Sequence, residues 1–341
     1  MFSQCTNLES FYMPNFNTSK VTNMQGLFSG CKKLNYINIS NFDTSSLTTM
    51  SSMFSLCSSL TSIDVSNFDT SSVKSMNSMF EECSSLNSLN LSNFKTSLVT
   101  NMEKKFKGCK NISTLELFNF DTSLVTNFEF MFSGCSSLKS LDLSNFVTNS
   151  CKSMNSMFSG CSQLTSLNLS SFDTHLVTTI NFMFSTCSSL VELDLSSFDI
   201  SKISTMTNVF YNCKKLQYIN LNNSKEKSGL KLSTVFSSVP INIAICIEPE
   251  NNININKSIS NIKCSIIDCS NDWKKHQKKI ITGKNICYNN CNETGKNKYE
   301  YENICYESCP IGTYPNNYNI CEIGNNSLQS EFWSSVIHLK N

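Results

Sequence analysis

Residues 53–71 read MFSLCSSLTSIDVSNFDTS, and this arrangement of apolar, serine and cysteine positions recurs along the chain with a period of 26 residues. Nine cysteines mark the period without a single insertion: Cys5, Cys31, Cys57, Cys83, Cys109, Cys135, Cys161, Cys187 and Cys213. A fixed period of this length predicts a solenoid, in which each unit is one coil that buries its apolar face by stacking on its neighbours.

The residues after each cysteine predict a short strand. In the fourth unit Leu86, Leu89 and Leu91 follow Cys83 by three, six and eight residues. The last two alternate with period 2, which is typical of a strand with one buried face. A phenylalanine stands eleven residues after the cysteine in eight units, and a polar stretch such as residues 69–72 then predicts that the chain turns.

The next apolar residues predict a short helix. Val73, Met76, Met79 and Phe80 are spaced by three, three and one residues, so that they would form an inward stripe on a helix. We interpret the recurring methionines as core packing and not as a metal or cofactor site. Cys151 stands where other units carry valine, and we expect it to be a small buried hydrophobe.

Units of this kind resemble the repeats of BspA-like leucine-rich-repeat surface proteins. The resemblance rests on segments such as residues 53–60 and 63–71, and it extends over about residues 1–222. It implies an α/β fold, a right-handed leucine-rich-repeat solenoid with parallel strands on one face and short helices on the other. It also implies display on microbial cells and adhesion to host proteins or surfaces.

One row departs from the wider leucine-rich-repeat pattern. The position that often carries Asn carries Phe here, and an asparagine row falls one residue earlier. This row comprises Asn15, Asn41, Asn67, Asn93, Asn119 and Asn145. Because of the shift, we do not assume that it forms the internal asparagine ladder of that family.

The repeat cysteines are interpreted as free buried thiols. Adjacent coils lie about 5 Å apart in a parallel stack. Side chains of one row point the same way, which makes the disulfide dihedral hard to reach, and nine is an odd number. Bridges within the row remain the less favoured alternative, and zinc is not expected because a ladder disperses its ligands.

One polar row on the outer face of the strands is the candidate binding surface. After Tyr12 it consists of Asn38, Asp64, Asn90, Glu116, Asp142, Asn168, Asp194 and Asn220. We expect a shallow, mildly acidic surface that hydrogen-bonds a protein or glycan ligand on a host or neighbouring cell. For any single residue, the alternative that it only solvates the sheet is at least as good. Calcium between neighbouring carboxylates is a weaker alternative, because Asn separates most of them.

The sequence predicts neither an enzyme nor a nucleic-acid-binding protein. A repeat places the same group in every unit, whereas an active site needs different groups at one place. A further acidic row is interpreted as turn and cap residues: Asp43, Asp69, Asp121, Asp173 and Asp199. We expect no cofactor and no metal. A net charge of +1 and the absence of Arg give no general attraction to nucleic acid.

A different cysteine population follows the repeats. It consists of Cys246, Cys264, Cys269, Cys287, Cys291, Cys305, Cys309 and Cys321. Their even number and the few apolar residues between them predict a small module held by disulfides, whose pairing the spacing does not give. Zinc is the less favoured alternative, because supporting histidines are absent. Residues 309–315 also resemble extracellular cysteine-rich modules of protist surface proteins.

We therefore expect a solenoid at residues 1–222, a cap or linker at 223–245, a cysteine-rich module at 246–325 and a tail at 326–341. Disulfides predict an extracellular or cell-surface location. The first residues fall into repeat register, which leaves no room for a signal peptide, and residues 332–339 are too short to span a bilayer. We thus expect a fragment of a longer protein that acts in recognition and adhesion. A structural coat protein that self-associates is the alternative.

Overall fold

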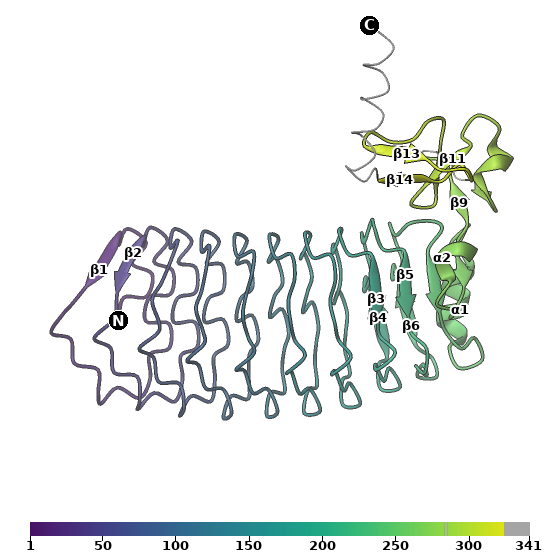
Figure 1. Ribbon diagram of the computed structural model, residues 1–341. Helices are drawn as coiled ribbons and strands as arrows, with labels where there is room; N and C mark the ends of the chain where they lie inside the picture. The colour runs from purple at the N-terminus through teal and green to yellow at the C-terminus, as the bar shows by residue number, and fades with distance from the viewer. Residues whose placement is uncertain (283, 285, 324–341) are drawn as a thin grey trace, which may run out of the picture. The chain divides into compact units, whose positions relative to one another are not determined.

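The computed structural model of the chain describes residues 1–282, 284 and 286–323 (Figure 1). These residues form two compact units. The first comprises residues 1–240 and 245–259, and the second comprises residues 241–244 and, as far as they are described, those from 260 onward. The tail expected at residues 326–341 lies outside the described residues.

The first unit is a parallel β-solenoid of about eleven turns (Figure 1). Ser10 lies opposite Tyr36 and Glu192 lies opposite Tyr218, so that neighbouring strands are offset by one 26-residue period. The strands that belong wholly or partly to this unit are β1 (Ser10–Tyr12), β2 (Tyr36–Asn38), β3 (Glu192–Asp194), β4 (Thr205–Thr207), β5 (Tyr218–Asn220), β6 (Lys231–Ser233) and β7 (Ala244–Cys246). In β1 and β3 the side chains alternate between exposed and buried, as the period-2 pattern predicts.

A second parallel ladder runs along the solenoid on another side of each coil. It consists of single bridges that step from Asn23 to Thr49, Ser75, Asn101, Asn127, Ser153 and Thr179. The pair β4 and β6 continues it, with Thr205 opposite Lys231. The period read from the sequence is therefore the register of the fold, and β6 and β7 carry it through residues where the repeat is no longer recognisable.

The short helix expected at residues 73–80 is not formed. The N–H groups of Met76, Ser78 and Phe80 donate to carbonyls of the next coil at 2.8–3.3 Å. Groups between them close tight turns to the third residue before, and Ser78 takes a left-handed φ of 55°. In a helix these N–H groups would bond to carbonyls of their own coil. Because they bond to the next coil instead, stacking of the coils excludes the helix. The apolar stripe still points inward, because Met76, Met79 and Phe80 are fully buried.

One row of phenylalanines forms the spine of the core. Neighbouring rings are nearly parallel, with centroids 5.6–6.1 Å apart. The row comprises Phe2, Phe28, Phe54, Phe80, Phe106, Phe132, Phe158, Phe184, Phe210 and Phe236. Aromatic stacking of this kind adds to the free energy of apolar burial. It continues only while every coil keeps the same length.

The repeat cysteines are free thiols, as expected. Those from Cys31 to Cys213 are buried, Cys5 of the first coil is exposed, and Cys151 is free and buried. From Cys31 onward each Sγ donates to the carbonyl of the phenylalanine 29 residues earlier, at 3.0–3.2 Å. Burial raises the pKa of these thiols, to about 12 for Cys57, so that they stay protonated at neutral pH.

A buried threonine row joins the coils through polar groups. Thr44 Oγ1 donates to the carbonyl of Asp69 at 2.9 Å and accepts the N–H of the same residue at 2.8 Å. Five threonines make both bonds: Thr44, Thr70, Thr122, Thr148 and Thr174. Each side chain thus satisfies two backbone groups of the next coil where the chain leaves the strand, which buried backbone requires.

The asparagine row does form a ladder, which we did not assume from its shifted position. Asn67 Nδ2 donates to the carbonyls of Ile39 and Phe42 in the preceding coil, at 3.2 and 3.0 Å. Asparagines that donate in the same way are Asn41, Asn93, Asn119 and Asn145. Ser171 and Ser197 replace them in later coils, each with one bond.

A helix closes the C-terminal end of the first unit. α1 (Ile253–Ser260) buries Ile255 and Ile259. The carboxylate of Glu226 accepts the N–H of Asn254 at 2.8 Å and that of Ile255 at 3.2 Å. An acceptor with negative charge at a helix N-terminus satisfies free N–H groups and complements the helix dipole.

The second unit consists of short elements. They are β8 (Ile266–Ile267), α2 (Trp273–His276), β9 (Lys279–Ile280), β10 (Cys287–Tyr288), η1 (Cys291–Thr294), β11 (Tyr299–Tyr301), β12 (Ile304–Tyr306), β13 (Thr313–Pro315) and β14 (Cys321–Ile323). Four of them form a sheet in the order β10-β9-β12-β11, and β13 pairs with β14. The apolar cluster around Ile281 is small, with Cys291 and Cys305 as its other buried members.

Disulfides hold the C-terminal region, as the sequence predicts. The bonds are Cys264–Cys287, Cys291–Cys305 and Cys309–Cys321. Cys246 and Cys269 are also disulfide-bonded. Cross-links of this kind substitute for the apolar burial that a module of this size lacks.

The numbers of free and disulfide-bonded cysteines can be measured by alkylation. Alkylation of the denatured, unreduced chain should label ten thiols, because ten of the eighteen cysteines are free. Labelling after reduction should add the remaining eight. Intact-mass spectrometry distinguishes these states. Fewer than ten labels before reduction would mean that cysteines of the solenoid are bridged.

The threonine row should contribute strongly to stability. Thr122→Val keeps the shape but leaves the N–H and the carbonyl of Val147 without their partner, which should lower the free energy of unfolding by about 2–4 kcal/mol. The matched control is Thr100→Val, which removes one exposed 3.3 Å bond to Lys74. Urea unfolding should leave this control within about 0.5 kcal/mol of the parent. Equal effects in both variants would refute the role given to the row.

Candidate interaction surface

The predicted polar row runs along one side of the coils, between two buried rows, and three of its members lie in strands: Asn38 in β2, Asp194 in β3 and Asn220 in β5. Asp64, for example, stands between Ile63 and Val65, which are buried. Asn38 and Asn220 are half-buried. The exposed members are Asp64, Asn90, Glu116, Asp142, Asn168 and Asp194. The stack therefore brings all eight into one line, with one residue from each coil.

Most of these side chains also accept a hydrogen bond from the backbone N–H two residues later. Oδ1 of Asp64 accepts the N–H of Ser66 at 2.9 Å. Residues that accept in the same way are Asn38, Asn90, Asp142, Asn168, Asp194 and Asn220. Hydrogen bonds from Ser66 lower the pKa of the Asp64 carboxyl, and those from Ser144 lower that of Asp142. These carboxylates stay ionised at neutral pH.

The outer face of the strands is acidic. It is made of the rows five, seven and nine residues after each repeat cysteine, and these rows contain no lysine. Their carboxylates are Asp64, Glu116, Asp142, Glu192 and Asp194. A surface that carries carboxylates in these rows favours ligands that are cationic or rich in hydrogen-bond donors.

Aromatic side chains stand on the same face. Tyr12 of β1, Tyr36 of β2 and Phe118 are 60%, 55% and 67% exposed. Ser10 lies opposite Tyr36 in the parallel pair, so that the two tyrosines are diagonal neighbours. Tyr36 and Phe118 were not among the predicted residues. The signal that could have found them is an aromatic residue in a row that mostly carries serine.

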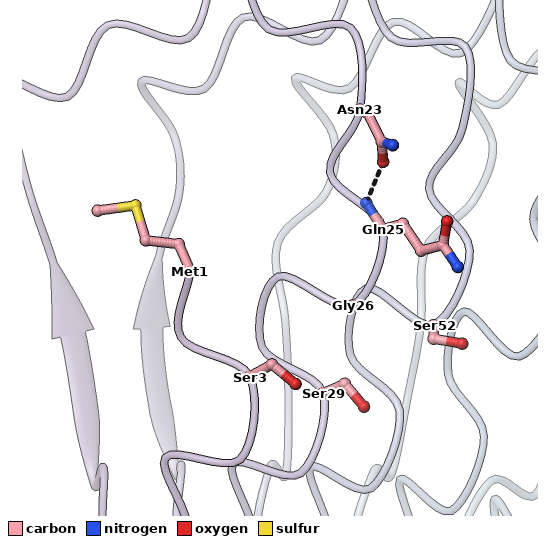
Figure 2. A pocket seen from close by; sticks show the side chains of 7 residues that line it. All are labelled: Met1, Ser3, Asn23, Gln25, Gly26, Ser29 and Ser52. Carbon is pink, nitrogen blue, oxygen red and sulfur yellow. Dashed lines mark hydrogen bonds between the residues drawn. The ribbon is translucent and has the colours of Figure 1, made fainter.

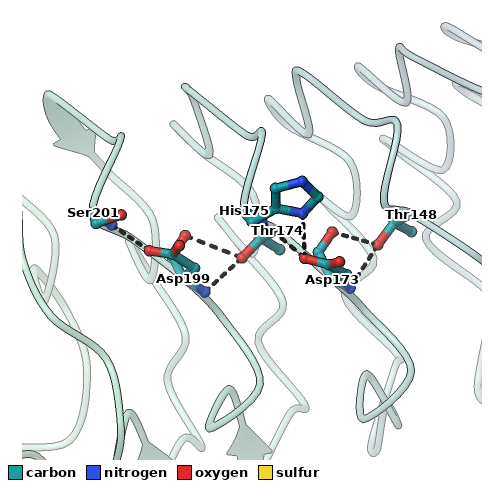
Figure 3. A network of polar contacts seen from close by, with 6 residues as sticks. All are labelled: Thr148, Asp173, Thr174, His175, Asp199 and Ser201. Atoms are coloured by element: carbon teal, nitrogen blue, oxygen red, sulfur yellow. Dashed lines mark hydrogen bonds and ion pairs between the residues drawn. The ribbon is translucent and has the colours of Figure 1, made fainter.

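A second acidic row, exposed except for the half-buried Asp199, lies where the chain turns after the polar row (Figure 3). Asp173 accepts the N–H of His175 at 3.1 Å and contacts its Nδ1 at 2.7 Å, and Asp199 accepts the N–H of Ser201 at 2.8 Å. The hydroxyl groups of Thr148 and Thr174 are engaged by the backbone of the next coil. The turn part of the interpretation is confirmed, because each aspartate accepts the N–H two residues later. The cap part is not, because no helix follows this row within the described residues of the solenoid.

A shallow depression near the N-terminus has an uncharged lining (Figure 2). Its lining residues are Met1, Ser3, Asn23, Gln25, Gly26, Ser29 and Ser52. Oδ1 of Asn23 accepts the N–H of Gln25 at 2.8 Å, so that this amide oxygen is already used. The lining contains no acid–base pair of side chains that could activate a nucleophile.

The described residues offer neither a metal site nor a membrane-spanning helix. Within residues 1–282, 284 and 286–323, no group of three or more His, Cys, Asp or Glu side chains could hold a metal ion. In the same part of the chain, no helix has the length and apolar character that crossing a membrane requires. The outer strand face therefore remains the best-defined candidate surface.

Comparison with known proteins identifies the family of the repeats. Residues 1–115 and 101–224 each match a family described as Mycoplasma protein of unknown function, DUF285. The chain belongs to this family. Together the two matches span the repeats and end close to β5. No curated protein matches the chain. The family description assigns no activity.

The aspartates of the turn row should make the solenoid sensitive to acid. Hydrogen bonds from Ser45, Ser71 and Ser123 lower the pKa of Asp43, Asp69 and Asp121. Their contribution to stability is present above about pH 4 and is lost as pH falls through the lowered values.

Replacing all three with Asn keeps the turn acceptors but removes the titration. Circular dichroism as a function of pH should show a shallower acid-induced loss of structure in this triple variant than in the parent. Replacing the same three with Ala should instead destabilise the protein at every pH, because the turn bonds are lost. Identical acid profiles for parent and Asn variant would contradict the assignment.

Proposed function

We propose that the chain is a non-enzymatic recognition and adhesion protein of a cell surface, which binds a protein or glycan through the outer face of its strands. The observation that carries the proposal is the line of amide and carboxylate side chains from Asn38 to Asn220, one in each of eight successive coils and six of them exposed. Such a face offers many weak and equivalent contacts, and multivalent contacts raise overall affinity without one strong site. Repetition of one group is also the opposite of what catalysis needs.

We also propose that the repeats are of the BspA-like leucine-rich-repeat type. The Leu-x-x-Leu-x-Leu rows and the asparagine ladder support this assignment. The disulfides of the C-terminal region support an extracellular location, because such bonds persist in oxidising environments.

A self-associating coat protein is the second candidate. Leu98 and Leu124 occupy the same row of adjacent coils and are 44% and 48% exposed. Side-by-side packing of two solenoids would remove these apolar side chains from water. Assembly that depends on protein concentration and needs no other partner would favour this candidate over adhesion.

Adhesion is tested by changing the charge of the face without changing its fold. In the triple variant Asp64→Asn, Asp142→Asn and Asp194→Asn, each amide keeps the acceptor for the N–H two residues later. Loss of three exposed charge contacts with the partner should weaken binding by about tenfold. We expect a loss of that size in binding to immobilised host matrix proteins or to a glycan array.

The matched control changes the same charge on the turn row. The variant Asp43→Asn, Asp121→Asn and Asp173→Asn should bind like the parent, because these residues lie away from the outer strand face. Equal loss in both variants would indicate a general effect of net charge. No loss in either variant would overturn the assignment of the binding face.

A further inference from the structure

Lys105 occupies a core position that other coils give to an apolar residue. Its equivalents one period away on either side are Met79 and Met131. Lys105 is fully buried, with 0% of its surface exposed. Its backbone keeps the contact between coils, because its carbonyl accepts the N–H of Phe80 at 3.0 Å. The substitution therefore places an amine inside the stack without breaking its register.

The amine has no strong hydrogen-bond acceptor. Nζ lies 3.0 Å from Sδ of Met76, and a thioether sulfur is a weak acceptor. Among the described residues, no carboxylate forms a salt bridge with it. Four ring centroids lie 5.2–5.9 Å from Nζ, those of Phe80, Phe94, Phe106 and Phe120.

The charged side chains of the neighbouring coils are engaged elsewhere. The ion pairs around this position are partly exposed: Lys104–Glu103 at 2.6 Å and Lys107–Glu81 at 2.9 Å. Glu129 of the following coil accepts the hydroxyl of Ser153. The buried thiols of Cys83 and Cys109 stay neutral, because burial raises their pKa. Among the described residues, no carboxylate forms an ion pair that would neutralise a charge on Lys105, and the four rings offer the weaker cation–π attraction alone.

Burial lowers the pKa of Lys105 to about 7. In a locally opened coil the amine is hydrated, and its pKa returns to about 10.4. Between these two values the opened form binds one more proton than the closed form. Each unit fall in pH then favours opening by about tenfold, and the effect levels off below about pH 7. The stack is therefore weaker at Lys105 at neutral pH than at alkaline pH.

The stability of a repeat array is close to a sum of terms for neighbouring coils, so that one weak interface can open while the others stay closed. We propose that Lys105 is a built-in opening point of the solenoid, at which the coil of Phe80 separates locally from the coil of Phe106 and the freed amine binds a proton. Opening exposes Cys83 and Cys109 and gives the array a hinge between two rigid blocks. This inference does not depend on the proposed adhesion.

Thiol alkylation of the native protein, read at each cysteine by mass spectrometry, tests the proposal. With rates normalised to those of the denatured chain, Cys83 and Cys109 should react at least about tenfold faster at pH 7.5 than Cys161 and Cys187. The ratio should fall toward one as the pH is raised to 9.5. Lys105→Met restores the residue of the row and should abolish the difference.

Lys107→Met is the control, because it removes a partly exposed lysine of the same coil and should leave the ratio unchanged. Hydrogen exchange gives an independent reading: the amide of Phe80 should be more protected in Lys105→Met than in the parent, and that of Phe158 equally protected in both. Equal reactivity of the four cysteines in the parent would overturn the proposal and mean that the four rings hold the ammonium in a closed stack. An unchanged ratio in Lys105→Met would also overturn it.

Discussion

One constraint organises the solenoid: the backbone groups of each coil bond to those of the coil one 26-residue period later. Two ladders on different sides of the coil impose it at once. A coil that was one residue longer or shorter would keep one ladder only by losing the other, and every alternating row would change from buried to exposed. The phenylalanine spine, the thiol row and the threonine row all follow from this equality of length.

Equal coils give the residues of one row nearly the same surroundings. Polar groups can then enter the core as complete rows, because each finds the same partner in the neighbouring coil. Thr44 and Asn67 do this with backbone groups of adjacent coils. A polar residue that occurs in only one coil of an apolar row has no such partner in the neighbouring coil. Lys105 is the clearest case, and in a repeat architecture local behaviour is expected where the repeat is broken.

Much of this fold could be predicted from the sequence. The period predicts the stack, alternation predicts strands, and the parity and context of the cysteines separate thiols from disulfides. The helix could not be predicted correctly, because apolar residues at Met76 and Met79 suit a helix and a series of tight turns equally well. What decides between them is whether N–H groups such as that of Ser78 bond within the coil or to the next one, and this depends on the stack.

The position of the polar surface could be predicted from the sequence, but its function could not. Alternation predicts that Asp64 points outward. An aspartate would also be favoured at this position by its hydrogen bond with the N–H of Ser66, which forms a turn whether or not the residue binds a partner. The asparagine ladder was not assumed, because the row is shifted by one residue, yet the Asn67 amide reaches the carbonyls of the preceding coil. Burial of Lys105 could have been suspected from its place in a methionine row.

Deletion of one whole coil tests the central constraint most directly. Removing residues 136–161 takes out 26 residues and joins Cys135 to Ser162, which restores the same register. The account predicts a folded, shorter solenoid that unfolds cooperatively in urea, and loss of cooperative unfolding when residues 137–161 are removed instead. If both deletions fold equally well, or if the deletion of a whole coil does not fold, the equality of coil length is not what holds the structure together.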